Sequence, residues 1–117
     1  KRSSGQLEAF RASWIADYPD AQNYLSLFYS KNKSPNGPNY THFESHFYDS
    51  IYKKSLQTSP AKQRIQYYHQ LDSLIIEEAA IVPLFYDQVI RFKQENIKGL
   101  GINPVNLLDL KKVYKSK

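Results

Sequence analysis

One segment near the middle of the chain constrains the fold more than any other. Ser59-Pro60 is a helix start signal, with serine at the cap and proline in the first turn, where its fixed φ suits a helix. The residues that follow place apolar side chains on one helical face: Ile65, Tyr68, Leu71, Leu74 and Ile75. The pattern predicts an amphipathic helix from Ala61 to Glu78, whose apolar face must pack against other parts of the chain.

Two further helices are predicted before it. One runs from about Ala21 to Tyr29, with Asp20 as its expected cap. The other occupies His46 to Leu56. Between them, residues 30–41 are rich in Pro, Gly and Asn, which favours a surface loop that adds nothing to the core.

Apolar segments flank these helices and are predicted as strands. Leu7 to Ile15, Ile81 to Tyr86 and Leu107 to Tyr114 are expected in sheet, with a loop from Ile97 to Asn106. The mixture indicates the α/β class, and strands without evident partners in so short a chain indicate a fragment. The lack of any methionine and of a signal peptide fits a fragment or a processed product.

Composition excludes several classes of protein. Ten tyrosines, six phenylalanines and one tryptophan argue against disorder, and there is no cysteine for disulfides or thiolate metal sites. The net charge is +5, but the positive residues are scattered, with a local excess only at Lys111, Lys112, Lys115 and Lys117. That excess is interpreted as a solvated terminus, and a basic surface also suits docking on an anionic membrane or importer.

No constellation of residues supports catalysis. His42 and His46 lack a third ligand for a metal, and no nucleophile elbow or Gly-rich phosphate loop occurs. The tyrosines are better explained by half-buried packing, with hydroxyls in water, than by stacking on nucleic acid. We therefore expect no catalytic residue, no metal and no cofactor.

A candidate binding site lies where the first predicted strand ends. Asp17 follows Trp14 closely, and in open α/β sheets ligands bind beyond the carboxyl ends of strands. Asp17 is either a partner for a ligand cation or a structural carboxylate, and Trp14 either covers a ligand or fills core. Arg11 needs an anion, which is either a structural partner, favoured from the residues alone, or a ligand carboxylate.

The segment from Phe10 to Asp20 resembles the W-x-A-D-Y-P-D-P segment of bacterial extracellular solute-binding proteins of the oligopeptide, dipeptide and nickel importer class. Other blocks are similar to the family in the same order: Asn23-Tyr24-Leu25, Phe47-Tyr48-Asp49-Ser50-Ile51, Arg64 to Tyr86, and Ile97-Lys98-Gly99 with the closing strand. Ala21 replaces the usual proline and Ser13 a common glycine, which leaves the class of ligand open.

The resemblance implies an α/β, C-terminal fragment of a two-lobed periplasmic-binding-protein-like fold. Residues 1–90 would belong to the second ligand-binding lobe, and residues 91–117 would return to the first. The resemblance also implies roles for three side chains. Asp17 would bind a peptide's α-ammonium, Trp14 would lie near the ligand, and Arg11 would reach the peptide's C-terminal carboxylate.

The function implied is capture of peptides outside the cytoplasmic membrane and delivery to an ABC importer permease. The full-length protein would be a monomer, periplasmic or extracytoplasmic, peripheral to the membrane and held there by a lipid anchor. One alternative is another solute, such as a nickel complex, a sugar or haem. The other, from a different class, is a basic module that binds nucleic acid or an acidic partner, which a steep salt dependence of binding would reveal.

Overall fold

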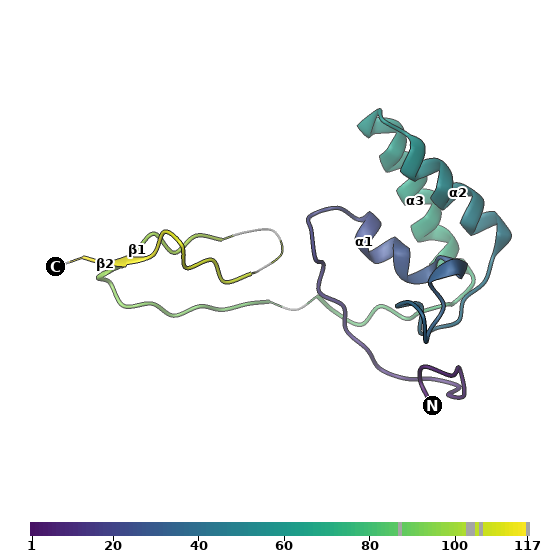
Figure 1. Cartoon of the computed structure of the whole chain (residues 1–117), viewed down its shortest axis with the longest axis horizontal. Helices are drawn as coiled ribbons and strands as arrows, with labels where there is room; N and C mark the ends of the chain where they lie inside the picture. Colours follow the sequence, from purple (N-terminus) through teal and green to yellow (C-terminus); the bar gives the residue numbers. More distant parts are fainter. Residues whose placement is uncertain (87, 103–104, 106, 117) are drawn as a thin grey trace. The chain divides into compact units, whose positions relative to one another are not determined.

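The structure is a computed structural model that describes residues 1–86, 88–102, 105 and 107–116. It divides into two compact units, Lys1–Pro83 and Leu84–Lys117. The first unit contains the helices, and the second contains a short pair of strands (Figure 1). Each unit is described by itself.

Two helices form the centre of the first unit. Helix α2 spans His46–Gln57 and α3 spans Ala61–Glu77, within a residue of the predicted bounds. Residues 58–60 join them, so that the two helices pack side by side as a hairpin (Figure 1). Because the spacing of apolar residues is a local property, both helices could be predicted from it.

The start of α3 differs from the capping that the sequence predicted. Pro60 is itself the N-cap of α3, and no side-chain cap hydrogen bond is made there. The side-chain cap belongs instead to α2, where Ser45 Oγ accepts a hydrogen bond from the Tyr48 backbone N–H at 3.2 Å. An extended residue with a hydroxyl acceptor satisfies one of the N–H groups that a helix start leaves without an intrahelical partner.

The predicted helix from Ala21 to Tyr29 is broken into shorter pieces. Helix α1 covers only Gln22–Leu25, and 3-10 turns follow at Ser26–Phe28 and Ser30–Asn32. Leu25 and Phe28 are buried, whereas Tyr24 is 47% exposed. The segment therefore contributes to the core by packing against α3 rather than by its own length.

The core lies between α1, its 3-10 extension and the α2–α3 hairpin. Its buried apolar members are Leu25, Phe28, Tyr48, Ile51, Tyr52, Leu71 and Ile75. The Tyr48 hydroxyl is buried and donates a hydrogen bond to the Leu25 carbonyl at 2.7 Å, and burial raises the pKa of Tyr48 above its usual range. The prediction that the tyrosine hydroxyls stay in water is wrong for this residue, because a buried backbone acceptor takes the place of water.

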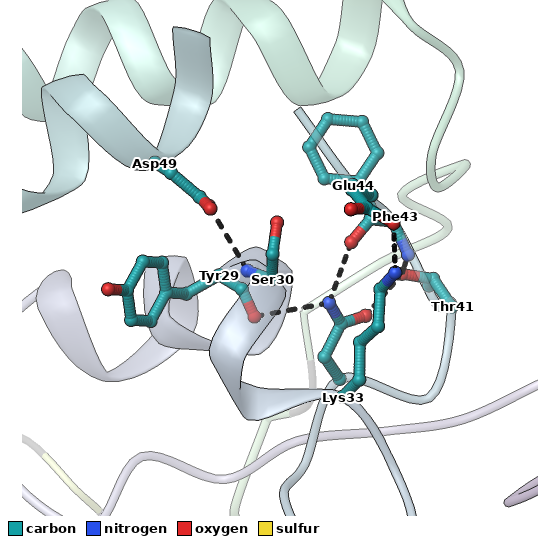
Figure 2. A network of polar contacts seen from close by, with 8 residues as sticks. Tyr29, Ser30, Lys33, Thr41, Phe43, Glu44 and Asp49 are labelled. Atoms are coloured by element: carbon teal, nitrogen blue, oxygen red, sulfur yellow. Dashed lines mark hydrogen bonds and ion pairs between the residues drawn. The ribbon is translucent and has the colours of Figure 1, made fainter. Parts of the chain in front are cut away.

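Residues 30–41 do more than the predicted surface loop. Asn39 is fully buried, and its Nδ2 donates to the carbonyls of Phe43 at 3.0 Å and Tyr29 at 3.3 Å (Figure 2). Thr41 Oγ1 donates to Asn39 Oδ1 at 2.9 Å, and Asp49 on α2 accepts a hydrogen bond from the Ser30 N–H at 3.1 Å. The side-chain amide in the interior thus adds to backbone hydrogen bonds within the loop, such as that from the Asn39 N–H to the Asn32 carbonyl at 2.8 Å.

The predicted sheet segments Leu7 to Ile15 and Ile81 to Tyr86 are wrong as strands. Both lack regular secondary structure, and within the described residues neither forms a ladder with another segment. A strand exists only with a hydrogen-bonded neighbour, and apolar side chains such as Ile15 and Val82, 70% and 77% exposed, have no covering layer here. The apolar pattern could not predict whether a partner strand would be present.

The second unit contains the one sheet found among the described residues. Strand β1, Ile97–Lys98, pairs antiparallel with β2, Tyr114–Lys115. β1 was predicted as loop, and only the end of the strand predicted over residues 107–114 is in sheet. Gly99 has φ of 77°, and a Cβ there would lie 2.0 Å from the Lys112 carbonyl oxygen, so the turn beside the sheet requires glycine. Pro104 and Asn106 of the predicted loop and Lys117 of the basic tail lie outside the described residues.

Candidate functional site

The candidate site residues lie on the segment that leads into α1. Residues 9–16 have no regular secondary structure and end in a bend at residues 17–20, which places Trp14 and Asp17 next to the start of the helix. The Trp14 side chain is 38% exposed, and Asp17 is exposed. An aromatic ring and a carboxylate are thus both accessible at one end of the first unit.

A third side chain, Asn23, connects these two residues. Trp14 Nε1 donates a hydrogen bond to Asn23 Oδ1 at 2.7 Å, and Asn23 Nδ2 donates to Asp17 Oδ2 at 3.3 Å. Asn23 lies on α1 and is only 4% exposed, so the amide is held by the helix while its two partners face solvent. The structure therefore brings Trp14 and Asp17 together through a residue that the sequence analysis did not select as a site residue.

Arg11 lies on the same segment and is exposed. The two side-chain hydrogen bonds of Asn23 join Trp14 and Asp17 to the helix and do not involve Arg11. The role of Arg11 as a ligand residue stays a prediction.

Asp20, three residues beyond Asp17, has a structural role. Its Oδ1 accepts a hydrogen bond from the Gln22 backbone N–H at 2.9 Å, and its Oδ2 lies 3.4 Å from Arg64 Nη2 on α3. Burial and a hydrogen bond to Asp20 raise the pKa of Tyr68 to about 12. The N-cap of α1 is Ala21 and not the predicted Asp20, but the Asp20 carboxylate still accepts a hydrogen bond from the first turn of the helix and also ties the bend to α3.

A chain of hydrogen bonds anchors the bend to the core. The Tyr18 hydroxyl donates to Gln22 Oε1, and Gln22 Nε2 donates to the hydroxyl of Tyr52, a buried residue of α2. Burial raises the pKa of Tyr52, so the hydroxyl stays protonated near neutral pH. Because residues on both sides of Pro19 are tied to helices, the bend holds its carboxylates in defined positions.

No metal or membrane-spanning feature appears in the part of the chain that the structure describes. Within it, no cluster of His, Cys, Asp and Glu could hold a metal ion. None of its helices has the length and apolar character to cross a membrane. What the site offers is a carboxylate beside an indole, which can bind a cation and cover apolar surface.

Several known proteins are similar in sequence to this chain over most of its length. The chain is 30% identical over 101 residues to the dipeptide-binding protein DppE of Bacillus subtilis, which covers 86% of the chain and 18% of that protein. It is 25% identical over 114 residues to the periplasmic oligopeptide-binding protein OppA of Salmonella typhimurium, covering 97% of the chain and 20% of the relative. The chain is similar to the bacterial peptide solute-binding proteins.

Not every member of this family that the chain resembles is named for peptides. The chain is 27% identical over 114 residues, 97% of its length and 21% of the relative, to the probable deoxycholate-binding periplasmic protein YgiS of Escherichia coli. No family model matches the chain. The chain spans about a fifth of the length of the curated relatives it matches.

Asn23 could have been found from one signal in the sequence. It begins the block Asn23-Tyr24-Leu25, which resembles the family's N-F-L continuation directly after the aspartate turn. Nothing in that spacing shows that the amide reaches back to residues six and nine positions earlier. The contact depends on how the segment before α1 lies against that helix.

Proposed function

We propose that this chain is the C-terminal part of a two-lobed protein that captures peptides outside the cytoplasmic membrane and delivers them to an ABC importer permease. The dipeptide- and oligopeptide-binding relatives support the proposal, because the chain is similar to them over 86% and 97% of its length. In this proposal residues 1–90 belong to the second ligand-binding lobe, and residues 91–117 return to the first.

The roles of the site residues follow from their chemistry. The Asp17 carboxylate receives the α-ammonium of the peptide, since a charge-assisted hydrogen bond to an ionised acceptor is the strongest that a side chain offers such a group. Trp14 covers the apolar part of the first peptide residue. Arg11 binds the C-terminal carboxylate of a peptide short enough to reach it.

One observation carries the proposal. Trp14 and Asp17 are both accessible, and both are joined to the buried amide of Asn23. A carboxylate and an indole held in this way form half of a site for an ammonium group with an apolar neighbour. The chain spans about a fifth of its relatives, so the opposite wall of the site is proposed to come from the rest of the protein.

The remaining features of the full-length protein are part of the same proposal. The protein is periplasmic or extracytoplasmic, peripheral to the membrane through a lipid anchor, and monomeric. It carries out no catalysis and needs no cofactor. The periplasmic oligopeptide-binding relative supports the location.

The test is a substitution that removes the charge at Asp17. In the closed protein, a ligand ammonium without its carboxylate would be buried and unpaired, at a cost of about 2–5 kcal/mol. Asp17→Asn in the full-length protein should therefore weaken binding of a free peptide by about 30- to several-thousand-fold. The same peptide with an acetylated amino terminus should bind the unsubstituted protein poorly and lose little more on substitution.

Asp20→Asn is the matched control, because it makes the same chemical change three residues away on a carboxylate bonded to the helix and to Arg64. It should change peptide affinity far less than Asp17→Asn does. Equal binding of the free peptide by Asp17→Asn and the unsubstituted protein, with the fold intact, contradicts the assignment. Tight binding of deoxycholate or another non-peptide solute, with no binding of peptides, would favour the alternative solute class. DNA binding with a steep salt dependence would favour the basic module.

The incompleteness of the site is tested with the chain alone. The 117 residues should bind peptide more weakly than 1 μM, since such affinity needs about 8 kcal/mol, which half of a cleft rarely supplies. Calorimetry of the isolated chain measures this directly. Micromolar affinity would show that the chain contains a whole site.

A further inference from the structure

We propose that Asn23 is a positioning residue of this site. By holding the side chains of Asp17 and Trp14 in fixed orientations, it sets the preference for a peptide with a free amino terminus. The inference rests on the proposed function, because it assigns Asn23 a role toward the same ammonium group. Asn23 itself does not touch the ligand: its side chain is 4% exposed and lies behind the two accessible residues.

The orientation of the Asn23 amide is determined by its partners. An indole N–H can only donate, so the carbonyl oxygen of the amide must face Trp14 Nε1, 2.7 Å away. An ionised carboxylate can only accept, so the NH₂ group must face Asp17 Oδ2, 3.3 Å away. Each contact therefore selects the amide orientation that the other contact needs.

The backbone of Asn23 is held as firmly as its side chain. Its N–H donates to the Asp20 carbonyl at 3.1 Å, and its carbonyl accepts from the Ser26 hydroxyl at 2.8 Å. The residue belongs to α1, which packs on α3. Asp17 and Trp14 lie on a segment without regular secondary structure. Their hydrogen bonds to the Asn23 amide attach both side chains to the helical core.

The expected consequence is a selective one. With the amide removed, Asp17 can take more than one rotamer, and the ligand ammonium must then order it at its own cost in free energy. A peptide with an acetylated amino terminus makes no ion pair with Asp17 and should be insensitive to that loss. The ratio of the two affinities therefore reports positioning, whereas general damage to the fold lowers both affinities together.

The experiment compares the two peptides on the full-length protein by calorimetry. Asn23→Leu keeps the branched shape and removes both polar contacts. It should reduce the preference for the free peptide about tenfold, the size expected for one hydrogen bond to a charged group. In the Asp17→Asn background, the same substitution should leave the ratio unchanged, because no carboxylate is left to position.

Trp14→Phe is the second variant, and it serves if Asn23→Leu does not fold. It removes the N–H that orients the amide while leaving Asn23 in place, and it should reduce the ratio about two- to fivefold, as expected for a weaker, indirect effect. Ratios that stay at the unsubstituted value in both single variants overturn the positioning role, as does an equal loss for both peptides. If the unsubstituted protein binds the free and the acetylated peptide equally, the proposed role of Asp17 in peptide binding fails. This outcome differs from the one that overturns only the positioning role of Asn23, so the two are distinguishable.

Discussion

The most demanding prediction concerns the buried amide of Asn39. This side chain is 0% exposed and donates from Nδ2 to the carbonyls of Phe43 and Tyr29, at 3.0 and 3.3 Å. Replacing it by aspartate, Asn39→Asp, keeps the shape and removes the NH₂ group. The perturbation therefore removes a hydrogen-bond donor without creating a cavity, and it adds a carboxyl group that can ionise.

The magnitude follows from the two carbonyls. A protonated carboxyl can donate to the Phe43 carbonyl, at a cost of about 1 kcal/mol for exchanging the amide donor for a weaker one. The Tyr29 carbonyl loses the second hydrogen bond but still accepts from the Asn32 N–H at 2.9 Å, so this loss costs about 0.5–1.5 kcal/mol. We expect the free energy of unfolding to fall by about 1–3 kcal/mol while the new carboxyl stays protonated.

The loss should grow as the pH rises. A buried carboxyl that faces carbonyl oxygens has a pKa above its unfolded value of about 3.9. The folded state then binds more protons than the unfolded state, so stability decreases from about pH 4 upward until the folded pKa is passed. Urea unfolding of the full-length variant at pH 4 and pH 7, followed by circular dichroism, measures both effects.

Asn36→Asp is the matched control, since Asn36 lies in the same loop and is exposed. Surface substitutions of this kind usually change stability by no more than about 0.5 kcal/mol. If Asn39→Asp and Asn36→Asp lower the unfolding free energy equally, or if the loss does not depend on pH, then the amide does not stabilise the loop.

Three further predictions use the same core. Leu71 is 0% exposed, and Leu71→Ala should lower the free energy of unfolding by about 2–5 kcal/mol. Ile65 is 50% exposed, and Ile65→Ala should lower it by less than about 1 kcal/mol, which urea unfolding of both variants would measure. Burial raises the pKa of Tyr48, so the free energy of unfolding should decrease as the pH rises above about 10, the pKa of an unfolded tyrosine. Tyr48→Phe has no hydroxyl to titrate, and its free energy of unfolding should decrease less over the same pH range in an alkaline unfolding series. Burial and the Asp20 carboxylate together raise the pKa of Tyr68 to about 12, and Asp20→Asn should lower it toward its ordinary value because the substitution removes the negative charge that favours the neutral phenol. Ultraviolet titration against the unsubstituted protein measures this, and an unchanged pKa would contradict it.

The sequence by itself determined the helical hairpin. The spacing of Tyr48, Ile51 and Tyr52, and of Leu71 and Ile75, repeats every three or four residues, and these side chains are the buried ones in the structure. Helical hydrogen bonds join residues four apart, so the information needed for a helix is contained within the helix itself. The order of family blocks likewise indicated the resemblance to the family before any contact was known, because it depends only on residue type and spacing.

Only the tertiary structure decided which contacts join distant residues. The sequence marked Trp14 and Asp17 as candidates by residue type, but the bond from each to Asn23 exists because the segment before α1 lies against that helix. The same holds for Asn39, which the composition of its loop placed at the surface and which the structure places in the interior.

The strands show the limit most plainly. The apolar character of residues 7–15 and 81–86 predicted sheet pairing wrongly, since a ladder requires a second strand whose position no local pattern encodes. Conversely, β1 and β2 pair residues 97 and 115, although the turn-rich composition around β1 predicted a loop. A helix satisfies its own backbone, whereas a strand or a buried amide depends on a partner from elsewhere in the fold, and that partner is what only the tertiary structure supplies.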